Sequence, residues 1–181
     1  MDIPNTKLTE KQKIVTRNLI SMNDEQVISL IQEFRENGEL FIVEPLIEML
    51  YSKRGQALKN SILDFIRDIK NQVAVIIITH SIQKYISDKY TTGLVSACWQ
   101  SSLDFSEELP LFFDILFSGD YQTAFEAFTV IENSIGNVSQ ENINLYIATI
   151  ESKLKIAPIE KQTLLTEMIV MLESFKRNGN E

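Results

Sequence analysis

The residue types that most often perform nucleophilic or acid–base chemistry are scarce in this sequence. It contains one histidine, His80, and one cysteine, Cys98. A thiol nucleophile needs a base beside it, and a zinc ion needs several ligands. One histidine and one cysteine cannot supply a conventional zinc site, and neither residue has an evident catalytic partner in the sequence. Cys98 lies in the apolar run Ala-Cys-Trp, which favours a buried small side chain. We interpret His80 as a structural or surface residue, and we expect no catalytic residue, no cofactor and no metal.

Two serine–lysine pairs also have a spacing associated with catalysis. Ser81 with Lys84, and Ser152 with Lys155, match the Ser-x-x-Lys of penicillin-recognising enzymes, yet no Ser-Asp-Asn or Lys-Thr-Gly motif occurs. The six glycines are isolated from one another, so no glycine-rich loop can bind phosphate. We therefore expect a non-enzymatic protein. The alternative, an enzyme whose carboxylate-lined cleft is assembled from separate helices, stays open.

The charged residues are unevenly placed along the 181-residue chain, whose formal net charge is −8. Residues 90–152 contain no Lys or Arg, but they hold ten of the sixteen aromatic residues and nine acids. The nine acids are Asp104, Glu107, Glu108, Asp114, Asp120, Glu126, Glu132, Glu141 and Glu151. An acidic surface with aromatic anchors favours a basic protein or peptide as partner. The competing interpretation is that the acids only solvate the surface and the aromatic side chains only fill a core.

Helices must position these residues, because apolar side chains recur at intervals of three and four throughout. The pattern predicts ten helices, beginning near residues 8, 23, 39, 56, 73, 92, 106, 121, 139 and 158. The run Val-Ala-Val-Ile-Ile-Ile at 73–78 is typical of a strand, but no other segment could pair with it. We therefore predict that 73–86 is a helix, and the most buried of the ten.

Polar residues mark several of the expected helix ends. The first helix is expected to begin with Thr6 or Thr9 as its cap, and Thr9 with Gln12 matches a capping box. Asn23 with Gln26 is expected to open the second helix. Ser106 and Ser139 are expected to cap two later helices. Asn37-Gly38 is expected to end the second helix as a C-cap.

An internal repeat relates two of the expected helix pairs. Shifted by 66 residues, the segment 46–52 (LIEMLYS) aligns with 112–118 (FFDILFS), and each copy continues through a turn into a second helix. Pro45 and Pro110 stand within the first helix of each copy, and Asp120 stands in a turn. In these features residues 40–135 resemble HEAT-like or armadillo-like α-solenoids. Val-Arg at the start of a second helix, a usual feature of that family, is absent.

The resemblance implies an all-α fold: a right-handed curved stack of about five antiparallel helix pairs, with a binding or scaffolding role. We expect residues 1–181 to form a single domain with short flexible ends at about 1–5 and 178–181. A compact irregular helical bundle is the alternative. Some α-solenoids bind nucleic acid or repair DNA, but they need a basic face. The only basic cluster, Lys53, Arg54, Lys59, Arg67 and Lys70, is diluted by Asp64 and Asp68. We expect no nucleic-acid partner.

The resemblance also indicates where a partner would bind, since second helices line the concave face of such a stack. On the eighth helix, Tyr121, Ala124, Phe125, Phe128, Ile131 and Ile135 are predicted to face inward. The predicted partner-binding residues are Trp99, Gln100, Asp104, Asp120, Glu126, Thr129, Glu132 and Asn133. Trp99 would be the aromatic anchor. No apolar segment approaches the length of a membrane span and no signal peptide is evident, so we expect a cytoplasmic protein without a membrane partner.

Overall fold

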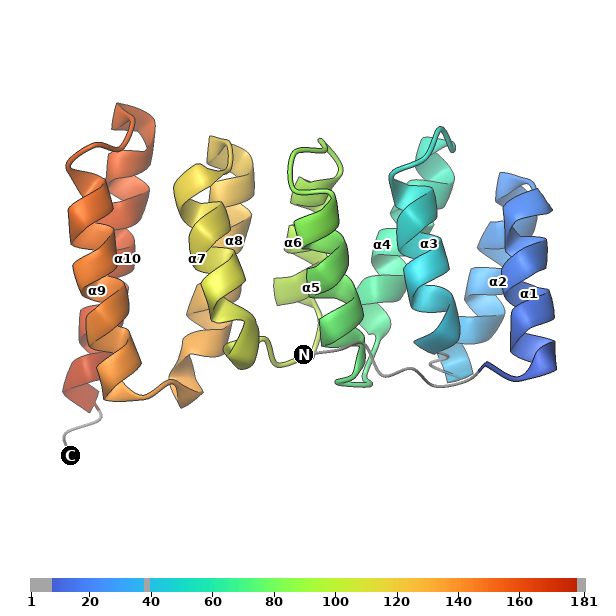
Figure 1. The fold of residues 1–181 in the computed structure, drawn as a ribbon, viewed down its shortest axis with the longest axis horizontal. Helices are drawn as coiled ribbons and strands as arrows, with labels where there is room; N and C mark the ends of the chain where they lie inside the picture. The colour runs from blue at the N-terminus through green and yellow to red at the C-terminus, as the bar shows by residue number, and fades with distance from the viewer. Residues whose placement is uncertain (1–7, 38–39, 179–181) are drawn as a thin grey trace. The chain divides into compact units, whose positions relative to one another are not determined.

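A computed structural model describes residues 8–37 and 40–178, and within these ranges the chain is helical with no strand (Figure 1). It has ten α-helices, which confirms the predicted all-α class for this part of the chain. They are α1 (Glu10–Ser21), α2 (Asp24–Asn37), α3 (Val43–Leu50), α4 (Gln56–Asp68), α5 (Ala74–Lys84), α6 (Thr91–Gln100), α7 (Leu109–Ser118), α8 (Tyr121–Ser134), α9 (Gln140–Leu154) and α10 (Ile159–Asn178). Three short 3-10 helices are η1 (Leu40–Ile42), η2 (Ser106–Glu108) and η3 (Ile135–Asn137).

The helices belong to two compact units, residues 1–104 and 105–181. In unit 1, helices that are two apart in the chain pack side by side: α2 on α4, α4 on α6, and α3 on α5. Sequential helices also pair, α3 with α4 and α5 with α6. Figure 1 shows α1, α3 and α5 nearer the viewer than α2, α4 and α6. Unit 1 is therefore built from two layers of helices. The single domain over 1–181 stays a prediction.

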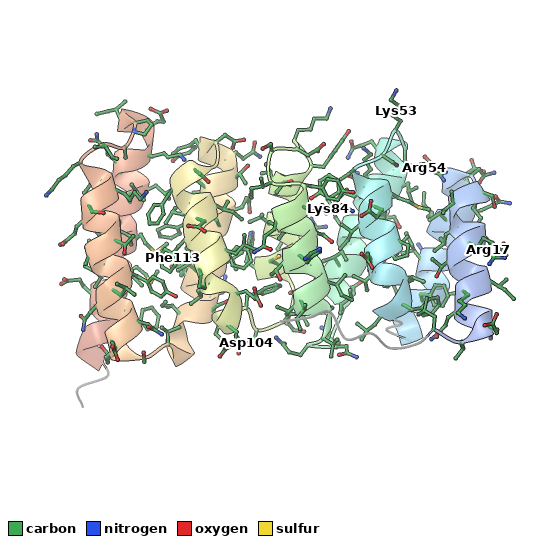
Figure 2. The ribbon with its side chains drawn as sticks, in the orientation of Figure 1. Arg17, Lys53, Arg54, Lys84, Asp104 and Phe113 are labelled. Atoms are coloured by element: carbon green, nitrogen blue, oxygen red, sulfur yellow. The ribbon has the colours of Figure 1, made fainter. Side chains whose placement is uncertain are left out.

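Unit 2 pairs α7 with α8 and α9 with α10, and α8 also packs on α10. Aromatic side chains fill much of the space between these helices. Phe113 projects from α7 toward α9 (Figure 2), where its ring stacks on that of Tyr146 with centroids 4.0 Å apart. Phe105 and Phe112 pack edge to face, and both are buried. The aromatic residues of the acidic stretch thus include genuine core residues.

Several helix ends agree with the local signals. Thr9 and Gln12 form the predicted capping box of α1. The side chains of Asn23 and Gln26 exchange hydrogen bonds with each other's backbone N–H at the start of α2. Ser139 caps α9 by accepting from the N–H of Asn142. These predictions are confirmed, whereas the C-cap expected at Asn37-Gly38 and the flexible ends involve residues outside the described ranges.

Two local predictions are wrong. Ser106 does not cap α7; it begins η2, and α7 follows Glu108 without a side-chain cap. With Pro110 at the start of α7, one N–H that would need a cap is already missing. Residues 73–86 contain a helix as predicted, but α5 buries only six of its eleven residues, against six of ten in α7. Val73 and Ile86 remain 39% and 45% exposed.

The internal repeat has a structural counterpart at the beginning of each copy. The 3-10 helices η1 and η2 begin at residues 40 and 106, and α3 and α7 follow them at 43 and 109. The register then slips by one residue, since α4 begins at 56 and α8 at 121. Each unit therefore contains one copy of a 3-10 turn, a first helix, a tight turn and a second helix.

Candidate protein-binding surface

The eight predicted partner-binding residues fall in both units. Trp99, Gln100 and Asp104 belong to unit 1, and the other five belong to unit 2. In unit 1, Trp99 is 36% exposed at the end of α6, so its ring is not wholly part of the core. The Gln100 side chain donates to Ser96 Oγ at 2.8 Å. Asp104 is exposed, and its backbone N–H donates to the side chain of Gln72 at 3.0 Å.

In unit 2 the buried side of α8 is made of small and β-branched residues. They are Thr123, Ala124, Ala127, Val130, Ile131 and Ser134. Because an α-helix turns by about 100° per residue, these residues occupy one side of the helix. Residues 121, 122, 125, 129, 132 and 133 then lie on the opposite side. We call these six residues, Tyr121, Gln122, Phe125, Thr129, Glu132 and Asn133, the α8 surface.

The α8 surface includes two aromatic residues that the apolar pattern assigns to the core. Tyr121 is 51% exposed and Phe125 is 50% exposed, so their predicted inward orientation is wrong. The physical reason is that Ala124 and Ala127 face the neighbouring helices, and their small side chains allow close packing on that side. Phe128 is half-buried between the two sides. Two aromatic rings one helical turn apart therefore stand beside the predicted acids.

The predicted residues of unit 2 differ in what they contact. Asp120 caps α8, accepting from the N–H of Thr123 at 2.8 Å. Thr129 and Asn133 donate to backbone carbonyls one turn earlier on α8, at 3.2 and 2.9 Å. Glu132 is exposed, whereas Glu126 is half-buried at the edge of the α8 surface. The helix thus brings Thr129, Glu132 and Asn133 to one side together with Tyr121 and Phe125.

A buried lysine holds the turn from which α8 begins. Lys161, in the first turn of α10, is only 6% exposed, and its ammonium donates to the carbonyls of Phe117 and Gly119. These carbonyls lie at the C-terminal end of α7, where a positive charge is favourable. Burial lowers the pKa of Lys161, and the nearby Asp120 and Glu160 carboxylates oppose that effect. The start of α8 is therefore fixed by α10.

The electrostatic setting differs between the units. Unit 2 has five Lys and Arg against twelve Asp and Glu, and one of the five cations is the buried Lys161. In unit 1, by contrast, several acids have cationic partners: Asp24 with Arg54 at 3.0 Å, Glu48 with Lys84 at 2.6 Å, and Asp68 with Arg35. The α8 surface therefore lies in the unit that carries nearly all of the excess negative charge.

The residues considered for catalysis have other roles. Cys98 is buried and donates to the carbonyl of Leu94, and burial raises the pKa of its thiol far above the ordinary value. His80 is exposed on α5, as expected of a surface residue. Ser81 is buried and donates to a backbone carbonyl, while Lys84 pairs with Glu48. Ser81 and Lys84 therefore do not form a nucleophile and its base.

The basic cluster considered for nucleic-acid binding is also committed to internal contacts. Lys59 is 2% exposed, and its ammonium lies 3.4 Å from the ring centroid of Tyr90. Arg54 contacts Asp24, and Arg67 pairs with Asp64 within α4. Three of the five cations thus have partners within unit 1, which leaves little charge for phosphate.

Comparison with known proteins adds no family to this description. No protein-family model, no curated protein and no solved structure matches the chain. Within residues 8–37 and 40–178, no three His, Cys, Asp or Glu side chains form a group that could hold a metal ion. No helix in the described part of the chain is long and apolar enough to span a membrane.

Proposed function

We propose that this chain is a non-enzymatic protein-interaction module whose α8 surface binds a basic segment of another protein. One observation carries the proposal: Tyr121 and Phe125 are half-exposed on the same side of α8 as Glu132, within the acidic unit. Exposed aromatic rings contribute much of the energy of protein interfaces. Surrounding acids raise the association rate of a cationic partner and select against anionic ones. Tyr121 and Phe125 take the anchoring role that the sequence predicts for Trp99.

The proposal includes the HEAT-like stack, a right-handed curved array of about five antiparallel helix pairs in the cytoplasm. Its support is that second helices pack in sequence within each unit, α2 on α4 on α6 and α8 on α10. The repeated start at residues 40 and 106 points the same way. Small-angle X-ray scattering should then give an elongated particle. A nearly spherical particle would favour the compact bundle instead.

The test of the α8 surface compares matched variants in affinity capture from the native cell lysate. Glu126→Lys with Glu132→Lys reverses two charges on α8, and Glu141→Lys with Glu151→Lys makes the same change on exposed acids of α9. Phe125→Ser removes one anchor, and Leu145→Ser is its control, because Leu145 is 62% exposed on α9. We expect the α8 variants to lose a retained partner while the α9 variants keep it.

The expected losses depend on the exposure of these groups. Exposed ion pairs contribute about 0–1 kcal/mol each, so the charge reversal should act mainly at low salt. Loss of an aromatic anchor should act at all salt concentrations. If the α8 variants keep their melting temperature and retain every partner that the parent captures, the α8 surface is not the binding site.

A further inference from the structure

Unit 1 contains an open groove of about 590 Å³ between α1 and α3. Helix α1 contributes Thr16 and Ile20, and α3 contributes Glu44, Pro45, Glu48 and Met49. Ordinary ligand sites have volumes of about 300–1,000 Å³, so the groove is large enough to receive several side chains. It shares no residue with the α8 surface, which belongs to unit 2.

The lining of the groove is largely apolar. Ile20 is 76% exposed although it is a large aliphatic residue. Met49 is 7% exposed, and Pro45 is half-buried beside it on α3. Contact between an aliphatic side chain and these three residues would remove apolar area from water, which is favourable. An aliphatic group therefore fits the groove.

One end of the groove is fixed by Arg54, which comes from the turn between α3 and α4. Its guanidinium donates to the carbonyls of Ile20 and Met22 at the C-terminal end of α1, and to Asp24 at the start of α2. Figure 2 shows Arg54 at this turn, beside α3. The end of α1 is thus held at a set distance from α3, and the positive charge of Arg54 is matched by Asp24. The groove is therefore already formed before a ligand binds.

The unmatched charge of the groove is negative. Glu48 accepts hydrogen bonds from Lys84 and from the hydroxyl of Tyr85. Glu44, one helical turn earlier, is exposed and makes no ion pair within the described part of the chain. A cation on the ligand would therefore meet the free carboxylate of Glu44. An anion would find no unpaired cation among the residues that line the groove, because Arg54 is paired with Asp24.

We propose that the groove between α1 and α3 binds a basic amphipathic peptide helix. Its aliphatic side chain packs against Ile20 and Met49, while a Lys or Arg about one turn away pairs with Glu44. Grooves between two helices commonly receive a third helix, whose apolar side chains recur at three and four residues. The groove is open to solvent rather than an enclosed cavity, which suits a helix lying on the surface better than a small molecule that needs to be surrounded.

Methyl-methionine NMR of the full chain tests the proposal at the site itself. The probe is a synthetic amphipathic helix of about 15 leucine and lysine residues, and a leucine–glutamate peptide of the same pattern is its control. Met49 lines the groove, while Met168 is fully buried in unit 2 and serves as the reference. We expect the Met49 resonance to shift to saturation with the lysine peptide only, and Met168 to stay in place.

Matched variants separate the groove from general attraction to an acidic protein. Ile20→Ser should weaken the Kd at Met49 about fivefold or more, because the main apolar contact is lost. Glu44→Gln should weaken it about threefold. Ile14→Ser and Glu25→Gln change an exposed isoleucine and an exposed acid outside the groove, and should alter the Kd less than about twofold. The proposal is overturned if the Met49 resonance does not respond to the lysine peptide, or if both peptides shift it equally. It is also overturned if Ile14→Ser and Glu25→Gln weaken binding as much as Ile20→Ser and Glu44→Gln do. A shift of Met49 on raising the protein concentration alone would overturn it too, because a second copy of the chain would then occupy the groove.

Discussion

Replacing Lys161 by methionine removes the ammonium that holds the start of α8 while keeping most of the apolar stem. The ammonium donates to the carbonyl of Phe117 at 3.0 Å and to that of Gly119. Hydrogen bonds to charged groups contribute about 1.5–3 kcal/mol each, but burying an ammonium costs part of that gain. The lowered pKa of Lys161 reflects this burial cost. We therefore expect Lys161→Met to lower the free energy of unfolding by about 2 kcal/mol.

Thermal unfolding followed by circular dichroism measures this loss and shows whether the two units unfold together. A loss of about 2 kcal/mol lowers Tm by about 4–8 °C if the whole chain unfolds in one transition, and by about 8–16 °C if unit 2 unfolds alone. Lys155→Met is the control, because Lys155 is exposed in the same unit. Lys161→Arg should retain most of the stability through its own donors. If Lys161→Met is as stable as the parent, the free-energy cost of burying the ammonium equals the stabilisation from its hydrogen bonds, and the reasoning is wrong.

Two further predictions concern unit 1. A Cβ at Gly55 would lie 2.8 Å from Asp24 Oδ2, the oxygen that accepts a hydrogen bond from the Gly55 N–H. We therefore expect Gly55→Ala to lower Tm. Gly136→Ala is the control and should leave Tm unchanged, because a Cβ there meets no atom within 4 Å. The hydrogen bond from the Gly55 N–H, together with Arg54, lowers the pKa of Asp24 below its ordinary value of 3.8. Burial raises the pKa of Glu48, but the hydrogen bonds from Lys84 and Tyr85 outweigh it, so the pKa of Glu48 lies below its ordinary value of 4.5. Both groups thus stabilise the fold fully above these ordinary values and lose that effect as pH falls through the lower folded values. Urea unfolding between about pH 5 and 3 should show a shallower pH dependence in Asp24→Asn with Glu48→Gln; an unchanged slope would contradict this.

Most of the features that the sequence predicts correctly are local ones. A threonine or asparagine followed three residues later by glutamine needs no knowledge of the rest of the chain, and both Thr9 and Asn23 bond to their glutamines as the spacing predicts. Residues 73–78 are predicted to be helical because no partner strand exists, which is an argument from the whole composition. The apolar spacing at three and four residues predicts the helices that build the two layers of unit 1, but it does not predict which helices pack on one another.

The site could be predicted only in part, because exposure depends on neighbours distant in sequence. Tyr121, Ala124 and Phe125 all fit one apolar stripe at intervals of three and four, but only Ala124 is buried, together with Ala127. The signal that separates them is size, since small residues mark the side of a helix that packs closely. The groove between α1 and α3 has no sequence signal, because Arg54 reaches a carbonyl 32 residues earlier in the chain.

The cations that cap the turns come from later in the chain than the turns themselves, and this has a consequence for synthesis on the ribosome. Lys161 is added 44 residues after Phe117, whose carbonyl it binds, and Arg54 is added 32 residues after Met22. At roughly 5–20 residues per second, the end of α7 waits about 2–9 s for its cap. During that interval the nascent chain can form α7, α8 and the local Asp120 cap, but not the hydrogen bonds from Lys161 to the turn between the two helices. That turn therefore gains its last hydrogen bonds only when the first turn of α10 has been synthesised and has folded back.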